Sequence, residues 1–174
     1  MLAVTKKSKA CLHEAAHAVT AVILGLRVDS VEVASAIDGT TDIRKTGEAG
    51  DWELLVACLA GKQMEAILGR SRSLYWSSDW NAATQLASRL TGSGATERDT
   101  VRLLSTACEL ASSILSCAKP SVRAVATQLK NTGSATGDDC KRALSLLSAS
   151  EDHAMRLKID ALRSKAGALL SLAS

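Results

Sequence analysis

The chain has 174 residues, of which 47% are hydrophobic but only 2% aromatic, so its core must be built mainly from Leu, Ala, Val and Ile. Ala and Leu favour helices, and this length is typical of a single domain. The formal net charge of +3 comes from scattered basic residues without stacking aromatics, so we expect no nucleic-acid partner.

The first predicted element is a helix over about residues 8–25, where apolar residues recur at helical spacing and Gly25 is a suitable stop. Residues 27–43 are rich in Val and contain the turn sequence DGT, which predicts two short strands or a hairpin. A second helix begins near Asp51, the expected cap, and ends at Gly69. A loop follows.

The third helix opens with SDWNAATQLASRL and is capped by Ser77 or Ser78. A long helix over about residues 96–118 follows, and Pro120 then starts a helix that continues over residues 121–129. The remaining pattern predicts a loop, a short helix and a last amphipathic helix: the loop KNTGSATGDD (130–139), the helix CKRALSLL (140–147) capped by Asp138 or Asp139, and the helix Glu151 to Leu172. The expected fold is mainly α, with a small β element near the N-terminus (α+β).

The sequence HEAAH in the first helix carries the clearest chemistry. A helix turns about 100° per residue, so His13 and His17 share one face and can offer two nitrogens to one metal ion. Glu14 lies one residue round the helix, where it can accept a proton from a water rather than bind the metal. This is the logic of H-E-x-x-H metalloproteases, in which zinc activates water and the glutamate is the general base.

A catalytic zinc usually has three protein ligands and one open position. The extended pattern HExxHxxGxxH is excluded, because its last position is Ile23. We do not expect a ligand in His153, which lies on the last helix, or in any of the five cysteines, which form no CxxC pair and read as reduced, buried thiols. The residues themselves leave Glu65 and Asp79 as candidates.

Three segments resemble the peptidase domain of the FtsH-type zinc metalloproteases. HEAAHAV (13–19) resembles the zinc-binding helix HEAGHAL, LAGKQMEAILG (59–69) resembles an L-G-G-R-A-A-E-E segment, and SSDWNAAT (77–84) resembles S-N-D-L-x-x-A-T. The helical stretch 101–147 also resembles the closing helices of that domain. The resemblance spans about residues 8–148, and the order of its three motifs is more specific than any one of them.

The resemblance implies that His13, His17 and Asp79 bind Zn²⁺ and that Glu14 is the general base. It also implies that Glu65 orients a ligand from behind; a salt bridge is the alternative role. The segment 31–43 sits where that family has the strand bordering its cleft, to which an extended peptide can add by main-chain hydrogen bonds.

The sequence departs from the family in three motif side chains, in the loop SRSLYWSS before Asp79, and in two absent features. Ala16 replaces the usual Gly, Lys62 the usual Arg, and Ala66 the second Glu. The chain also contains no GxxxxGK[ST] motif and no hydrophobic run of membrane-spanning length. We therefore expect a soluble, cytoplasmic protein without its own ATPase.

The expected function is an ATP-independent zinc metallopeptidase acting on peptides or unfolded protein segments. Residues 1–150 form the FtsH-like domain, and 151–174 are either an extension of it or an interaction tail. Two alternatives stay open: a peptidase subunit that depends on a separate ATPase or forms a homo-oligomer, and a non-catalytic metal-stabilised binding or regulatory module.

Overall fold

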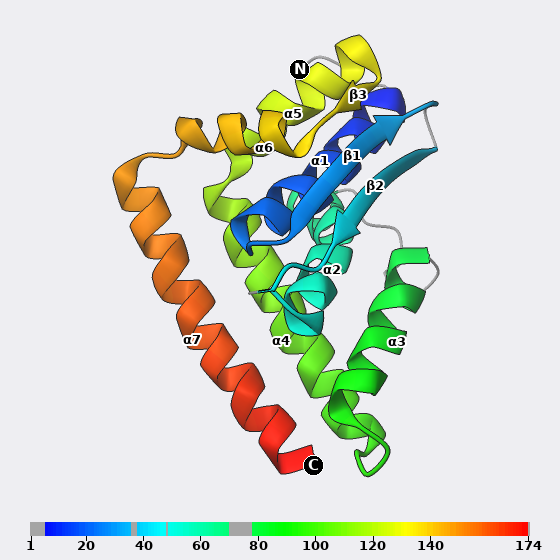
Figure 1. The fold of residues 1–174 in the computed structure, drawn as a ribbon, viewed down its shortest axis with the longest axis vertical. Coiled ribbons are helices and arrows are strands. Elements are labelled where there is room, and N and C mark those ends of the chain that lie inside the picture. Colours follow the sequence, from blue (N-terminus) through cyan, green and yellow to red (C-terminus); the bar gives the residue numbers. More distant parts are fainter. Residues whose placement is uncertain (1–5, 36–37, 48, 70–77, 174) are drawn as a thin grey trace.

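The computed structural model of the chain describes residues 6–35, 38–47, 49–69 and 78–173. Within these ranges the fold is mainly helical, with a small antiparallel sheet built chiefly from the N-terminal part of the chain (Figure 1). The elements in chain order are α1 Lys6–Ile23, β1 Arg27–Val33, β2 Gly39–Arg44, α2 Asp51–Ile67, α3 Ser78–Thr91, α4 Glu97–Cys117, α5 Lys119–Thr132, β3 Ser134–Ala135, α6 Gly137–Ala143, the 3-10 turn η1 Leu144–Leu146, and α7 Ala149–Ala173.

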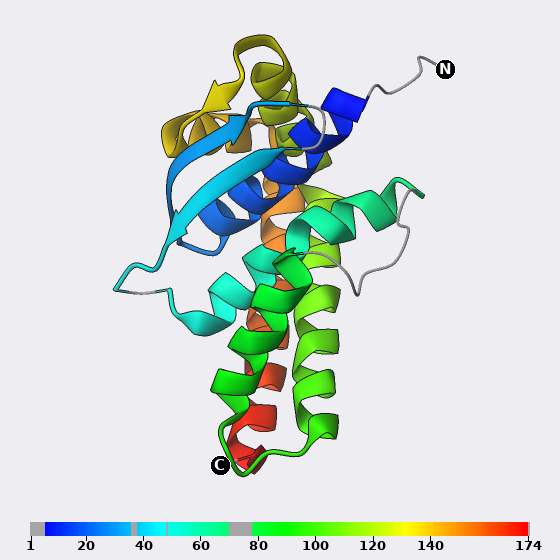
Figure 2. The ribbon, with the colours of Figure 1, turned by 90° about the vertical axis from the view of Figure 1, so that its right-hand side faces the viewer.

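The molecule has two parts that share helix α2. In the first part, α1 packs against the sheet and against α2 and α5. In the second part, α4 lies between α2 and α7 and also contacts α3. Figure 2 shows that α3, α4 and α7 extend away from the sheet towards the C-terminus. Each part has its own cluster of buried apolar side chains, and α2 contributes to both clusters.

Helix α1 follows the prediction closely and ends where a glycine allows it. Gly25 adopts a positive φ of 83°, and the Leu26 N–H donates to the Ala21 carbonyl at 2.9 Å. This is the hydrogen bond that closes a helix when the residue after the end turns left-handed. The chain then reverses directly into β1, which lays the sheet against the helix it has just left.

The predicted hairpin is present, and β1 is the central strand of the sheet order β2-β1-β3. Val31 pairs with Thr41 on β2 and with Ala135 on β3, both antiparallel. The prediction of a continuous loop over residues 130–139 is therefore wrong. α5 continues to Thr132 and β3 follows directly. The sequence pattern did not indicate β3, because a two-residue strand is stabilised by pairing with a strand far away in the sequence.

Two predicted helix caps are also wrong. Thr136, not Asp138 or Asp139, caps α6: its hydroxyl accepts the Asp139 N–H at 3.3 Å, and the Asp139 carboxylate accepts the Thr136 N–H at 2.9 Å. This reciprocal pair is a capping box, so the aspartate is its second member. The helix that it starts ends at Ala143 and tightens into η1, whereas one helix over 140–147 was predicted.

The cap of α2 is Gly50 rather than Asp51. Asp51 is the first helical residue, and its carboxylate accepts from the Lys45 ammonium at 3.1 Å. Glu53, one turn in, accepts the Gly50 N–H at 3.0 Å through Oε2. Of the two predicted caps for α3, Ser78 is the first residue of the helix, and Ser77 and the preceding loop lie outside the described residues.

Helix α7 packs along α4 and buries Met155, Ile159, Leu162 and Ala166. The Arg163 guanidinium also donates to the other oxygen of Glu53 at 3.0 Å and so joins α7 to the start of α2. In the part of the chain that the structure describes, no single helix is long and apolar enough to cross a membrane, and only α4 and α5 taken together, bent by 81°, meet that test of length and composition.

Candidate metal centre

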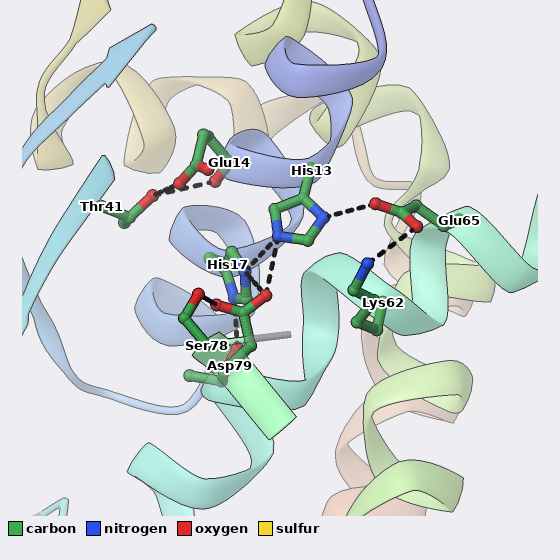
Figure 3. Close-up of polar contacts among 9 residues, drawn as sticks. His13, Glu14, His17, Thr41, Lys62, Glu65, Ser78 and Asp79 are labelled. Carbon is green, nitrogen blue, oxygen red and sulfur yellow. Dashed lines mark hydrogen bonds and ion pairs between the residues drawn. The ribbon is translucent and has the colours of Figure 1, made fainter. Parts of the chain in front are cut away.

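Three side chains from two helices converge on one point (Figure 3). His13 and His17 project from α1, and Asp79 projects from the first turn of α3. The His13 Nε2 atom lies 2.9 Å from Asp79 Oδ2 and 3.1 Å from His17 Nε2, and His17 Nε2 lies 3.6 Å from Asp79 Oδ2. The predicted histidine pair and one of the two candidate third ligands are therefore neighbours.

The outer nitrogen of each imidazole is already occupied. The Nδ1–H of His17 donates to the Ala57 carbonyl at 2.7 Å, and the Nδ1–H of His13 donates to Glu65 Oε1 at 2.9 Å. A neutral imidazole that donates through Nδ1 presents a bare lone pair at Nε2. Two such lone pairs and a carboxylate oxygen repel one another unless a positive centre lies between them. The inner atoms therefore require a proton or a metal cation.

The spacing of these atoms suits a metal ion. Bonds of about 2.0–2.1 Å to a tetrahedral zinc place neighbouring ligand atoms about 3.3 Å apart. The three separations of 2.9, 3.1 and 3.6 Å bracket that value. Imidazole nitrogen and carboxylate oxygen are also donors that divalent transition metals accept. The residues present thus fit a metal ion with three protein ligands, although the donors alone do not identify the metal.

Without a metal, the same electrostatics bind a proton. Burial alone would lower the pKa of His13, but hydrogen bonds to Asp79 and Glu65 outweigh it and raise the pKa to about 9. Burial likewise opposes ionisation of Asp79, yet its hydrogen bonds to His13 and His17 hold its pKa well below the usual range. The contact with His13 also lowers the pKa of Glu65. The donor group is therefore a site of negative potential that favours a cation.

Gly61 on α2 makes room for the imidazole pair. A Cβ atom at this position would lie 2.4 Å from His17 Nε2 and 2.6 Å from His13 Nε2, closer than any real contact of this kind. Glycine weakens a helix interior by about 0.5–1 kcal/mol relative to alanine, so local propensity does not explain it. The close approach of the α2 backbone to the two imidazole rings explains why this position is a glycine.

Glu14 lies beside strand β2, one position round α1 from the ligands (Figure 3). Its side chain is buried, and its Oε2 atom accepts a hydrogen bond from the Thr41 hydroxyl at 2.7 Å. Gly39 lies next to the same carboxylate: a Cβ there would lie 2.7 Å from Glu14 Cγ. The carboxylate is therefore held from the sheet side and is not a member of the converging group.

Glu65, the other candidate third ligand, lies on the outer side of His13. Its Oε1 accepts from His13, and its Oε2 accepts from the Lys62 ammonium at 3.2 Å. This places Glu65 behind a ligand, as the resemblance implies, rather than in the donor group. His153 is exposed on α7 and takes no part in the described metal-ligand group.

Cys58 is influenced electrostatically by the site, because the negative charge of Asp79 acts on its thiol. Burial, with Asp79 adding to it, raises the pKa of the Cys58 thiol to about 11, so it remains a neutral thiol. All five cysteines are free.

Sequence reasoning missed three residues that shape this site: Gly39, Thr41 and Gly61. A signal existed for Gly61, because a glycine inside a helical pattern costs stability and so points to a packing reason. The inward face of β2 also follows from strand alternation, but which residue it meets depends on how the sheet lies on α1.

The chain matches no known protein-family model, and no curated protein matches it at a significant level.

Proposed function

We propose that the chain is a zinc metallopeptidase, related to the peptidase domain of the FtsH-type proteases, that hydrolyses peptides or unfolded protein segments without ATP. The observation that carries the proposal is the convergence of His13, His17 and Asp79, with the outer nitrogens of both imidazoles already hydrogen-bonded. A glutamate stands next to the first ligand in sequence. This combination provides three ligands, a fourth position for water, and a candidate base.

Zinc is the metal that we assign, because two imidazoles and one carboxylate form a common open, catalytic zinc site and the HEAAH sequence is typical of zinc peptidases. His13 Nε2, His17 Nε2 and Asp79 Oδ2 would hold it. When bound, the ion supplies Lewis-acid activation of water and of the scissile carbonyl. Glu65 and the Ala57 carbonyl keep the two imidazoles in the tautomer that presents Nε2.

Glu14 is the residue to which we assign proton transfer. The Thr41 hydrogen bond occupies Oε2, and Oε1, which lies beside Gly39, would take the proton of the attacking water and pass it to the leaving amine nitrogen. Burial of the carboxylate beside β2 keeps bulk water from competing for it. Glu14 and the two histidine ligands share helix α1, so the helix itself sets the relative positions of these three residues.

A peptide is the substrate class that the surroundings favour. In the described sheet, β2 is an edge strand, and it lies beside Glu14. An extended peptide can add to such an edge through main-chain hydrogen bonds, which recognise the backbone rather than particular side chains. This suits unfolded segments of varied sequence.

The decisive experiment measures cleavage of a fluorescently labelled unfolded protein by the purified, zinc-loaded chain, with no nucleotide added. We expect wild-type activity to fall by about 10²- to 10⁴-fold in Glu14→Gln, which removes the base but no ligand. Asp79→Ala should instead lose bound zinc, measured by elemental analysis. Cleavage that persists unchanged in Glu14→Gln would overturn the proposal, as would unchanged zinc in Asp79→Ala.

A non-catalytic, metal-stabilised module is the second candidate. It is favoured by one observation: the ligands join α1 of the first part of the fold to α3 of the second, so a bound ion would link the two. In that case zinc would raise the melting temperature of both wild type and Glu14→Gln, and neither would cleave any substrate. Dependence on a separate ATPase would appear as cleavage only after a partner is added.

A further inference from the structure

We propose that Thr41 is the positioning residue for the Glu14 carboxylate, a role that rests on the proposed function. Its hydroxyl donates to Glu14 Oε2 at 2.7 Å, from β2, the second strand after α1. The general base would thus be aimed by the sheet, while the metal ligands are oriented by α2. The general base and the metal ligands would thus be held in place by different elements of the fold.

The first argument is burial. Glu14 is only 8% exposed, and a buried carboxylate is costly unless hydrogen bonds replace its lost water. The short Thr41 contact is charge-assisted, a class about twice as strong as a neutral hydrogen bond. Removing the donor would leave a buried oxygen unsatisfied, and the side chain would turn towards water instead.

The second argument is the space beside the contact. Gly39 lies two residues before Thr41 and therefore on the same face of β2. A Cβ at Gly39 would lie 2.7 Å from Glu14 Cγ and 3.0 Å from Oε1. The strand thus combines an open position for the carboxylate stem with a donor for its tip, an arrangement that specifies one orientation of Glu14.

The third argument is register. Thr41 is opposite Val31, which is fully buried on the central strand, whereas the neighbouring Thr40 is exposed. A slip of one residue would turn Thr40 inward and Thr41 outward. The pairing with the core strand therefore determines which of the two threonines meets Glu14.

Positioning predicts an effect on the rate rather than on binding. Loss of the Thr41 hydroxyl should lower kcat by about 10- to 100-fold, the scale expected when a catalytic group is misplaced by about 1 Å. KM should change little, because the hydroxyl faces Glu14 rather than the outer strand edge. Zinc affinity should stay at the wild-type value, because the three ligands and their outer hydrogen bonds are untouched.

The test compares Thr41→Val, which keeps the β-branched shape, with Thr41→Ser, which keeps the hydroxyl. We expect Thr41→Val to lose kcat and Thr41→Ser to regain most of it. A readout independent of catalysis is the Glu14 side-chain carboxyl ¹³C resonance, assigned with Glu14→Gln and recorded at one pH on the metal-free full chain. It should move in Thr41→Val but keep its position in the matched control Thr40→Val.

The outcomes separate this proposal from the proposed function. An active wild type with unchanged kcat in Thr41→Val would overturn the positioning role and leave the peptidase intact. A wild type that cleaves nothing would overturn the peptidase, and the ¹³C resonance would then decide alone whether Thr41 holds the carboxylate. A resonance that Thr41→Val does not move would overturn the proposal in either case.

Discussion

Helix α1 and the helical bundle bury different mixtures of side chains. On α1 the fully buried apolar residues are small, chiefly Ala15, Ala16, Ala18 and Ala21, and they are accompanied by the buried polar His17, Glu14 and Thr20. In the bundle the fully buried residues include large ones, namely Leu55, Leu59, Leu103, Leu110 and Ile114, beside alanines of α3 and α4.

This difference separates chemistry from stability. Small side chains let the sheet and α2 approach α1 closely, so their backbones and short polar groups can reach the imidazoles and the carboxylate. Large aliphatic side chains remove more apolar surface from water and contribute more to the free energy of folding. The candidate metal centre lies where the two parts meet at α2 and α3. A truncation inside the bundle core, away from the ligands, should therefore lower stability and leave metal binding intact.

The largest expected effect is on stability, from Leu110→Ala in the bundle core. Leu110 is fully buried, and such a truncation costs about 2–5 kcal/mol through lost burial and a cavity. Chemical denaturation should measure this loss, and the folded variant should still bind metal with wild-type stoichiometry. The exposed Leu157 on α7 is the matched control, and Leu157→Ala should change stability by less than about 0.5 kcal/mol. Equal losses in the two variants would contradict the assignment of the bundle core.

The next largest effect should be on stability and metal binding together, because Gly61→Ala inserts a methyl group between α2 and the imidazole pair. We expect overpacking to cost about 1–3 kcal/mol of stability, with weakened metal binding as the rings are displaced. Calorimetric unfolding measures the loss of stability, and metal titration measures the loss of metal affinity.

Gly167 in α7 is the matched control for this change. A Cβ there would meet nothing within 4 Å, so Gly167→Ala should stabilise the helix by up to about 1 kcal/mol and leave metal binding unchanged. If Gly61→Ala were stabilising as well, the close approach of α2 to the rings would be wrong.

The smallest effect should come from Glu65→Gln, which keeps the shape of the side chain but removes its charge. Partners behind a metal-binding histidine typically contribute about 10- to 100-fold in metal affinity, so we expect a loss within that range and little change in unfolding. Competition with a chelator measures it. Glu109→Gln breaks an exposed ion pair with Lys165 far along α4 and should keep wild-type affinity. Similar metal affinities for Glu65→Gln and Glu109→Gln would show that Glu65 does not contribute to metal binding.

Much of this protein could be predicted from local pattern. Apolar spacing and glycine stops predicted α1 and the hairpin, and the i, i+4 histidines predicted a shared face for two ligands. These features depend on neighbours within a few residues, so the sequence determines them by itself. The failures at Asp51 and Asp138 or Asp139 were also local, because several cap formers stood side by side and their competing partners decided among them.

Tertiary structure decided what depends on distant partners. The residues alone left both Glu65 and Asp79 as candidates. The packing of α2 on α1, and of α3 on α2, places Asp79 inside the donor group and Glu65 behind His13. The strand β3 exists because β1 pairs with it, and Thr41 meets Glu14 because the sheet lies on α1 in one register. Such contacts join segments far apart in sequence, so the local periodicity of the sequence does not predict them.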